Sequence, residues 1–137
     1  MALTHLLDTS VLKRLHRSEV RGEVEGLALG EHLARTSISD LEIGYSARNV
    51  NEWDHLLEAL SAFDLVETTT GHLRRALQVQ RLLAQRSQRG RKIPDLLVAA
   101  AAEQLGLSVL HYDADFDLIA SVTGQHTQWV VPPGTVD

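Results

Sequence analysis

The sequence contains no cysteine among its 137 residues. Disulfides, thiolate metal sites and cysteine nucleophiles are therefore excluded. Aromatic residues make up only 4% of the chain, which disfavours the stacking platforms that bind single-stranded nucleic acids. No apolar run approaches the roughly 20 residues that cross a bilayer, and the first residues lack the basic start and apolar stretch of a signal peptide. We therefore expect a cytoplasmic location and no membrane partner.

Positive charge is in short supply. The chain has 13 Lys and Arg residues against 18 Asp and Glu residues, which gives a net charge of -5. This balance argues against a nonspecific nucleic-acid coat, because such binding depends on neutralising phosphates. A divalent metal held between carboxylates would cancel part of the negative charge locally. The composition therefore leaves a metal-dependent nucleic-acid enzyme open.

Short apolar segments alternate with helical patterns along the chain. The length predicts one domain spanning residues 1–137. Strands are predicted at residues 3–8, 32–38, 64–68, 107–112 and 127–131. Helices are predicted between them, among them residues 51–63, 71–92 and 93–106. Inward-facing residues of the second of these helices are predicted to be Leu73, Leu77, Leu82 and Leu83. The alternation predicts the α/β class, as a three-layer α/β/α domain with a mainly parallel central sheet.

Four acidic residues fall where such a sheet gathers its ligands. Asp8 and Asp113 end predicted strands, and Glu42 and Asp95 lie in the first turns of predicted helices. In parallel sheets, ligands collect outside the carboxyl ends of the strands, where the following helices also begin. We therefore expect these four side chains to meet at one site, although they are far apart in the sequence.

Each carboxylate also has an ordinary structural explanation. Asp8 suits a helix cap, and Ser39 with Glu42 suits a capping box. Asp95 suits the positive end of a helix dipole. The stretch "DADFD" could form a solvated turn and cap, in which Asp117 is interpreted as a surface residue. Only the combination of carboxylates carries the functional interpretation.

Four segments in order resemble a known family: "LLDTSVL", "SISDLEIGYSA", "KIPDLLVAAAAEQLGLSVLHYD" and "DADFDLIA". Together they resemble the PIN domain, and specifically the VapC toxins of VapBC toxin–antitoxin pairs, over essentially the whole chain. The resemblance implies a small α/β/α nuclease fold and a divalent-metal-dependent endoribonuclease that acts as the toxin of a type II system. Its catalytic acidic positions map onto Asp8, Glu42, Asp95 and Asp113, and Asp115 matches an additional acidic position.

The implied cofactor is Mg²⁺ (or Mn²⁺), which prefers oxygen ligands and suits a chain without cysteine. We expect Asp8 and Asp95 to be the principal metal ligands. Glu42 and Asp113 would bind directly or through water, and Asp115 would bind a second metal or orient a water. Asp113 is ranked ahead of Asp115 as the fourth carboxylate.

Substrate contacts are predicted from polar and basic residues near these carboxylates. Candidates for contact with RNA phosphates or an attacking water are Thr9, Ser10, Arg14, Arg89, Arg91 and Lys92. Helix capping is the alternative for the two hydroxyl residues, and a solvated face is the alternative for the basic run. His111, at the end of a predicted strand, is interpreted as structural.

The implied partners are an RNA substrate and a cognate VapB-like antitoxin, with a homodimer and a hetero-oligomer that includes the antitoxin. Trp53, Leu56, Leu57 and Leu60 share one helical face, which could be core, dimer interface or antitoxin groove. A PIN-domain nuclease of RNA processing is one alternative function. A non-catalytic α/β signalling or binding module is another, but a receiver-type acidic pocket needs an acidic residue where Leu7 stands.

Overall fold

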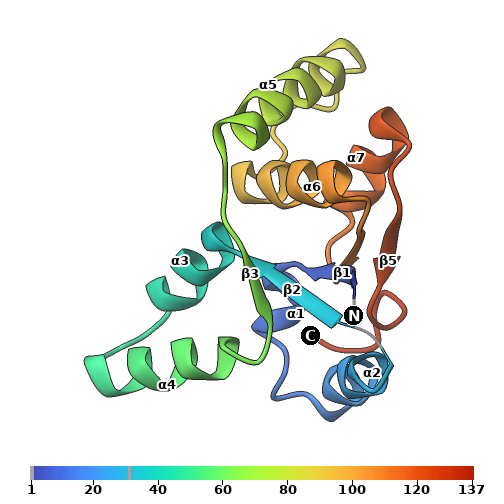
Figure 1. Ribbon diagram of the computed structural model, residues 1–137. Coiled ribbons are helices and arrows are strands. Elements are labelled where there is room, and N and C mark those ends of the chain that lie inside the picture. The colour runs from blue at the N-terminus through green and yellow to red at the C-terminus, as the bar shows by residue number, and fades with distance from the viewer. Residues whose placement is uncertain (1, 31) are drawn as a thin grey trace.

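The chain folds around a five-stranded sheet with the strand order β3-β2-β1-β4-β5. The computed structural model describes residues 2–30 and 32–137. Every neighbouring pair of strands is parallel, so the predicted mainly parallel sheet is confirmed (Figure 1). The strands are β1 (Leu3–Leu7), β2 (His32–Thr36), β3 (Asp64–Val66), β4 (Ser108–His111) and β5 (Thr127–Trp129).

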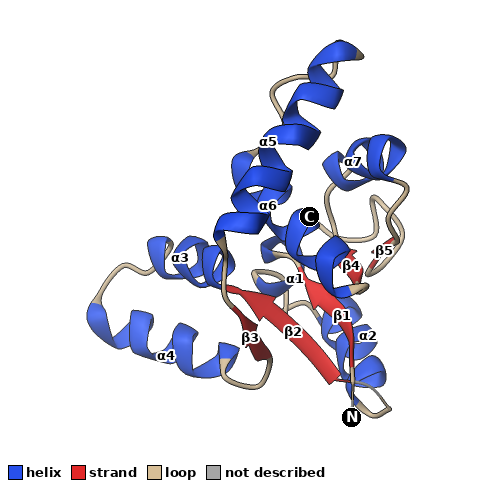
Figure 2. Cartoon of the chain, turned by 45° about the horizontal axis from the view of Figure 1, so that its top comes forward, coloured by secondary structure: helices blue, strands red, loops and turns tan. Residues whose placement is uncertain are grey.

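Helices cover both faces of this sheet, which confirms the three-layer architecture. The helices are α1 (Thr9–Leu12), α2 (Ser18–Ala28), α3 (Ser37–Tyr45), α4 (Val50–Leu60), α5 (Thr70–Gln85), α6 (Ile93–Leu105) and α7 (Asp115–Thr123). One face packs against α5, α6 and α7, and the other against α1 and α2 with parts of α3 and α4. The α3–α4 pair projects to one side of the sheet (Figure 2). No helix in the described part of the chain is both long and apolar enough to cross a bilayer.

Alternation along the central strands divides the core into two halves. In β1, Leu6 packs into the half below α6, whereas Leu7 packs into the half formed with α1 and α2. In β4, Val109 and Leu110 divide in the same way. All four side chains are fully buried, and each stabilises the fold by about 1.5–3 kcal/mol relative to exposure. Burial on both faces fixes the strand ends, and with them the residues that follow.

Helix α6 is buried along most of its length. Residues 95–102 are all buried. Pro94 lies in its first turn, where a missing N–H costs nothing, and Gly106 ends it with a φ of 69° in the left-handed region that glycine tolerates. The alanines at positions 99–102 allow close approach to the sheet and to α5. Asp95 is therefore fixed in place by a rigid helix.

The structure corrects one expectation about a helix face and bears on a second face whose role was left open. Leu73 and Leu77 were predicted to face inward, but they are 51% and 64% exposed. Instead, α5 packs against its neighbours through His72, Ala76, Val79 and Leu83. In α4, Leu60 is buried but Trp53 remains 47% exposed. The end of α4 therefore belongs to the core, whereas its beginning does not.

Candidate active site

Asp8 stands at the carboxyl end of β1 and is 1% exposed. Its Oδ2 accepts a hydrogen bond of 2.9 Å from the Ser10 backbone N–H and so caps α1. Its Oδ1 is buried without a hydrogen-bond partner. Burial raises the pKa of this carboxyl, and the nearby charge of Glu42 adds to the effect. Asp8 therefore caps a helix with one oxygen and presents the other to the site.

Asp95, in the first turn of α6, is 5% exposed. Its pKa is raised to about 8, chiefly by burial and in addition by the charges of Asp8 and Asp113, against the opposing effect of Lys92. Its Oδ2 has no hydrogen-bond partner. These charge effects place Asp95 beside both strand-end aspartates, as the topology predicted. In the metal-free protein this carboxyl holds a proton at neutral pH.

Asp113 and Asp115 occupy the turn between β4 and α7. The Asp113 Oδ1 accepts a hydrogen bond of 2.9 Å from the Asp115 backbone N–H, and its Oδ2 accepts one from Lys92 Nζ. Burial opposes ionisation of Asp113, but these hydrogen bonds outweigh it and lower its pKa. Asp95 rather than Asp113 keeps the proton, because Asp95 is more deeply buried and Asp113 holds the ammonium. Asp95, Asp113 and Asp115 each offer an oxygen within 4.8 Å of the others, a spacing that suits a metal ion.

Glu42 is tied to the site through Thr9. The Thr9 hydroxyl lies 2.7 Å from Glu42 Oε1 and 2.8 Å from Ser39 Oγ. The capping-box alternative is wrong, since Thr36 caps α3 and accepts a hydrogen bond from the Ser39 backbone N–H. Glu42 is thereby held one turn into α3, close enough to act electrostatically on Asp8. Thus the acidic residues predicted to converge lie around one edge of the sheet.

Ser10 and Arg14 are used within the protein. Ser10 is buried, and its hydroxyl accepts a hydrogen bond of 2.8 Å from the Tyr112 backbone N–H. The Arg14 guanidinium donates to the Ser10 carbonyl at 2.8 Å and to the Asp137 carbonyl at 2.6 Å, and it lies over the Tyr112 ring. The contacts with Tyr112 join α1 to the turn after β4, which carries Asp113. The predicted substrate roles of both residues stay predictions.

The basic run before α6 does not simply point into solvent. Arg91 Nη1 lies 2.8 Å from Asp115 Oδ1, and Lys92 pairs with Asp113. Arg89 is exposed and is available for a phosphate. For Arg91 and Lys92, any contact with RNA would compete with carboxylates that they already neutralise.

His111 is a packing residue at the end of β4. It is fully buried, and its ring centroid lies 4.9 Å from that of Phe116 and 5.0 Å from that of Trp129. Burial lowers its pKa to about 4, despite the nearby acidic charges, so the imidazole is neutral at pH 7. Its Nδ1 accepts a hydrogen bond of 3.2 Å from the Asp113 backbone N–H. The ring thus fixes the turn beneath the carboxylates, in agreement with its structural interpretation.

Sequence reasoning missed two features of the site. Thr36 and Ser39 were not seen as part of a buried hydroxyl chain, in which their oxygens lie 3.3 Å apart. Lys92 was assigned to RNA rather than to the carboxylates. The spacing of three between Lys92 and Asp95 at a helix start was the available signal, because residues three apart share a helix face.

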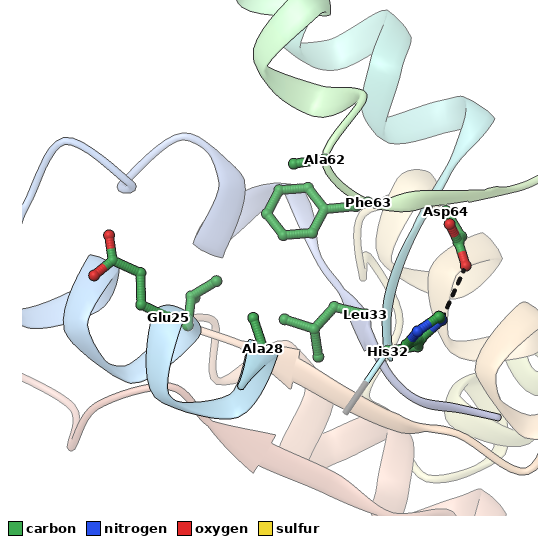
Figure 3. Close-up of a pocket in the computed structure, with 8 residues that line it drawn as sticks. Glu25, Ala28, His32, Leu33, Ala62, Phe63 and Asp64 are labelled. Atoms are coloured by element: carbon green, nitrogen blue, oxygen red, sulfur yellow. Dashed lines mark ion pairs between the residues drawn. The ribbon is translucent and has the colours of Figure 1, made fainter. Parts of the chain in front are cut away.

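A cavity of about 400 Å³ lies away from these residues. It is lined mostly by apolar side chains of α2, β2 and the α4–β3 turn, with Phe63 and Leu33 facing it and Glu25 of α2 also in the lining (Figure 3). His32 and Asp64, whose Nδ1 and Oδ2 atoms are 3.7 Å apart, stand at its edge. Both residues begin strands, so this cavity opens at the opposite edge of the sheet from the carboxylates.

The similarity to known proteins agrees with this geometry. The family model of the PIN domain matches residues 5–122. Ribonuclease VapC51 of Mycobacterium tuberculosis is 69% identical over 137 residues, covering 100% of both chains. Ribonuclease VapC21 of the same species is 42% identical over 98% of this chain and 99% of its own. In the structure of VapBC2 from Rickettsia felis bound to a promoter DNA fragment, one chain matches with a TM-score of 0.78 at 17% identity, covering 93% of this chain and 99% of that one. The chain belongs to the PIN-domain family, within its VapC group.

Proposed function

We propose that the chain is the toxin of a type II toxin–antitoxin pair and acts as a divalent-metal-dependent endoribonuclease. Two full-length relatives, at 69% and 42% identity, are ribonucleases of the VapC group. Their names support the toxin rather than an RNA-processing enzyme. The observation that carries the proposal is a pair of buried carboxylate oxygens, Asp8 Oδ1 and Asp95 Oδ2, without hydrogen bonds.

These residues fit a divalent metal. Buried carboxylates are unfavourable unless they are paired or bind a cation, and here burial raises the pKa values of both Asp8 and Asp95. All donors of the cluster are carboxylate oxygens, which Mg²⁺ and Mn²⁺ prefer. Asp95, Asp113 and Asp115 would hold the ion together with Asp8, and Glu42 would bind through water.

The chain's own part in cleavage is to position groups. When bound, the metal supplies a water activated for attack and offsets negative charge on the phosphate. Asp8 is fixed by its bond to the α1 backbone, and Asp95 by the buried start of α6. Glu42, held by Thr9, would orient the attacking water by accepting a hydrogen bond from it. The exposed Arg89 would hold an RNA phosphate next to this edge.

A VapB-like antitoxin is the expected inhibitor. The solved structures similar in fold include VapBC complexes and a toxin–antitoxin complex from Klebsiella pneumoniae. The apolar surface between α3 and α4 would accept the antitoxin, because Leu41 and Tyr45 are 71% and 93% exposed there and a hollow lies between them and Trp53. We also expect a homodimer.

RNA cleavage by the purified toxin, freed of antitoxin, tests the proposal. Total RNA is incubated with Mg²⁺ or Mn²⁺, with EDTA, and with two variants. Asp8→Asn should abolish cleavage while leaving the fold nearly intact. Glu23→Gln, at an exposed position on α2, removes one charge away from the site and should cleave at the wild-type rate. Cleavage that persists in EDTA, or that is equal in Asp8→Asn and wild type, would refute the proposal.

A further inference from the structure

Lys92 contacts two carboxylates of the cluster from its solvent side. Its Nζ donates a hydrogen bond to Asp113 Oδ2 and lies 3.9 Å from Asp95 Oδ2. The ammonium therefore bridges two of the three residues whose oxygens lie within 4.8 Å of one another. Mg²⁺ coordinates oxygen ligands at about 2.0–2.1 Å. An ammonium that is hydrogen-bonded to Asp113 Oδ2 and lies 3.9 Å from Asp95 Oδ2 therefore competes with the metal for the space between these oxygens.

Arg91 and Lys92 differ in how far their side chains are exposed to solvent. The Arg91 side chain is 25% exposed and is paired with Asp115, which is 18% exposed. The Lys92 side chain is 61% exposed, although its carboxylate partners are 16% and 7% exposed. Lysine carries its charge on a flexible four-carbon stem, whereas the arginine fork is rigid. Of the two cations, Lys92 therefore has the more open path from its carboxylate partners into solvent.

We propose that Lys92 is a tethered counter-ion, which occupies the cation position between Asp95 and Asp113 and must withdraw before a divalent metal binds. The inference rests on the proposed function, since it concerns the metal which that function requires. Metal binding then becomes an exchange of one cation for another. The lysine stabilises the metal-free protein and at the same time weakens its affinity for metal.

The sequence offers a matched control. Its two lysines are Lys13 and Lys92, and Lys13 is exposed just after α1. Lys13→Met and Lys92→Met change the net charge equally, so only the position of the removed charge differs. We expect Lys92→Met to bind Mn²⁺ about tenfold more tightly than Lys13→Met. Tenfold corresponds to about 1.4 kcal/mol, the low end for a hydrogen bond to a charged group.

Mn²⁺ binding is measured by electron paramagnetic resonance of the free ion, with the full chain at pH 8 so that fewer protons compete for the carboxylates. Asp95→Asn is included and should lose most binding. A second readout follows the lysines directly. After reductive methylation with ¹³C, Mg²⁺ should shift the Lys92 methyl signal toward that of a solvated lysine and leave the Lys13 signal unchanged.

The outcomes separate this inference from the proposed function. If wild type binds Mn²⁺ and Asp95→Asn does not, but Lys92→Met binds no more tightly than Lys13→Met, the counter-ion role is refuted and the nuclease proposal stands. A Lys92 methyl signal that ignores Mg²⁺ would refute it as well. If no form binds Mn²⁺, both ideas fail together.

Discussion

Replacing Asp95 with asparagine should stabilise the metal-free protein at neutral and alkaline pH. Burial, with the charges of Asp8 and Asp113, raises the pKa of Asp95 from 3.8 to about 8. Between these values the folded protein holds a proton that the unfolded chain has released. The free energy of unfolding therefore falls as pH rises through this window, by up to about 1.4 kcal/mol per pH unit. Asparagine has the same shape and carries no charge to bury.

The magnitude follows from the same linkage. If the whole pKa difference between the folded and unfolded states acted on stability, Asp95→Asn would raise the free energy of unfolding by about 6 kcal/mol above pH 8, which is an upper limit. Asp113 faces solvent in part and can relax away once both carboxylates ionise, so we expect a gain of about 2 kcal/mol at pH 8. The gain should vanish only well below the unfolded-state pKa of 3.8, at about pH 2–3, where Asp95 is protonated in both the folded and unfolded states.

His111 has the opposite effect on the pH dependence of stability, and it acts at lower pH. Burial lowers its pKa from 6.5 to about 4, so the unfolded chain binds the extra proton between these values. Its contribution makes stability rise with pH in that window and stop changing above about pH 6.5. The loss of stability with rising pH that Asp95 causes should therefore be clearest in wild type between pH 6.5 and 8.

Urea unfolding followed by circular dichroism, in EDTA at several pH values, measures these differences. Glu23→Gln is the control and should track wild type. Saturating Mg²⁺ should reverse the order, because a ligand that binds the native wild-type site stabilises it. A wild-type stability that is flat or rising from pH 6.5 to 8, together with no gain in Asp95→Asn, would contradict a carboxyl held protonated by burial.

Two further substitutions probe the surroundings of the site. Gly44→Ala should destabilise the fold by about 1–2 kcal/mol and change tryptophan fluorescence, because the new Cβ would lie 2.7 Å from Trp53 Nε1. A variant as stable as wild type would show that α4 can move away from α3 without loss of stability. Thr9→Val should slow RNA cleavage about tenfold while costing only about 1 kcal/mol in urea unfolding, since it releases Glu42. Wild-type cleavage by Thr9→Val would mean that Glu42 needs no anchor.

The strand ends were the most predictable part of the molecule. Alternating strands and helices specify a parallel sheet, and a parallel sheet gathers its carboxyl ends at one edge. The order of strands and helices along the chain therefore predicts that Asp8 and Asp113 lie at the same edge of the sheet, and the pairing of β1 with β4 brings them side by side. The position of Asp95 at the same edge was also predictable, because Pro94 marks the first turn of α6.

Hydrogen-bond partners and helix faces were less predictable. The leucines of α5 occupy two adjacent stripes, and periodicity does not tell which one packs against α6. The structure buries the stripe with Ala76 and Val79 and leaves Leu73 and Leu77 outside, because small residues allow closer approach. Likewise, local patterns matched Glu42 to a capping box, whereas its actual partner, Thr9, is 33 residues away. Such contacts depend on the tertiary arrangement rather than on spacing.

The strand order has a consequence for synthesis of the chain on the ribosome. β1 is made first but pairs with β4, and the turn that carries Asp113 and Asp115 follows β4. Domains fold as units during translation, so the carboxylate cluster cannot assemble until residues 108–115 have left the exit tunnel. A nascent chain that ends before them has β1 and Asp8 but no cluster. The proposed nuclease would therefore stay inert through most of its own translation, next to the RNA of the ribosome that makes it.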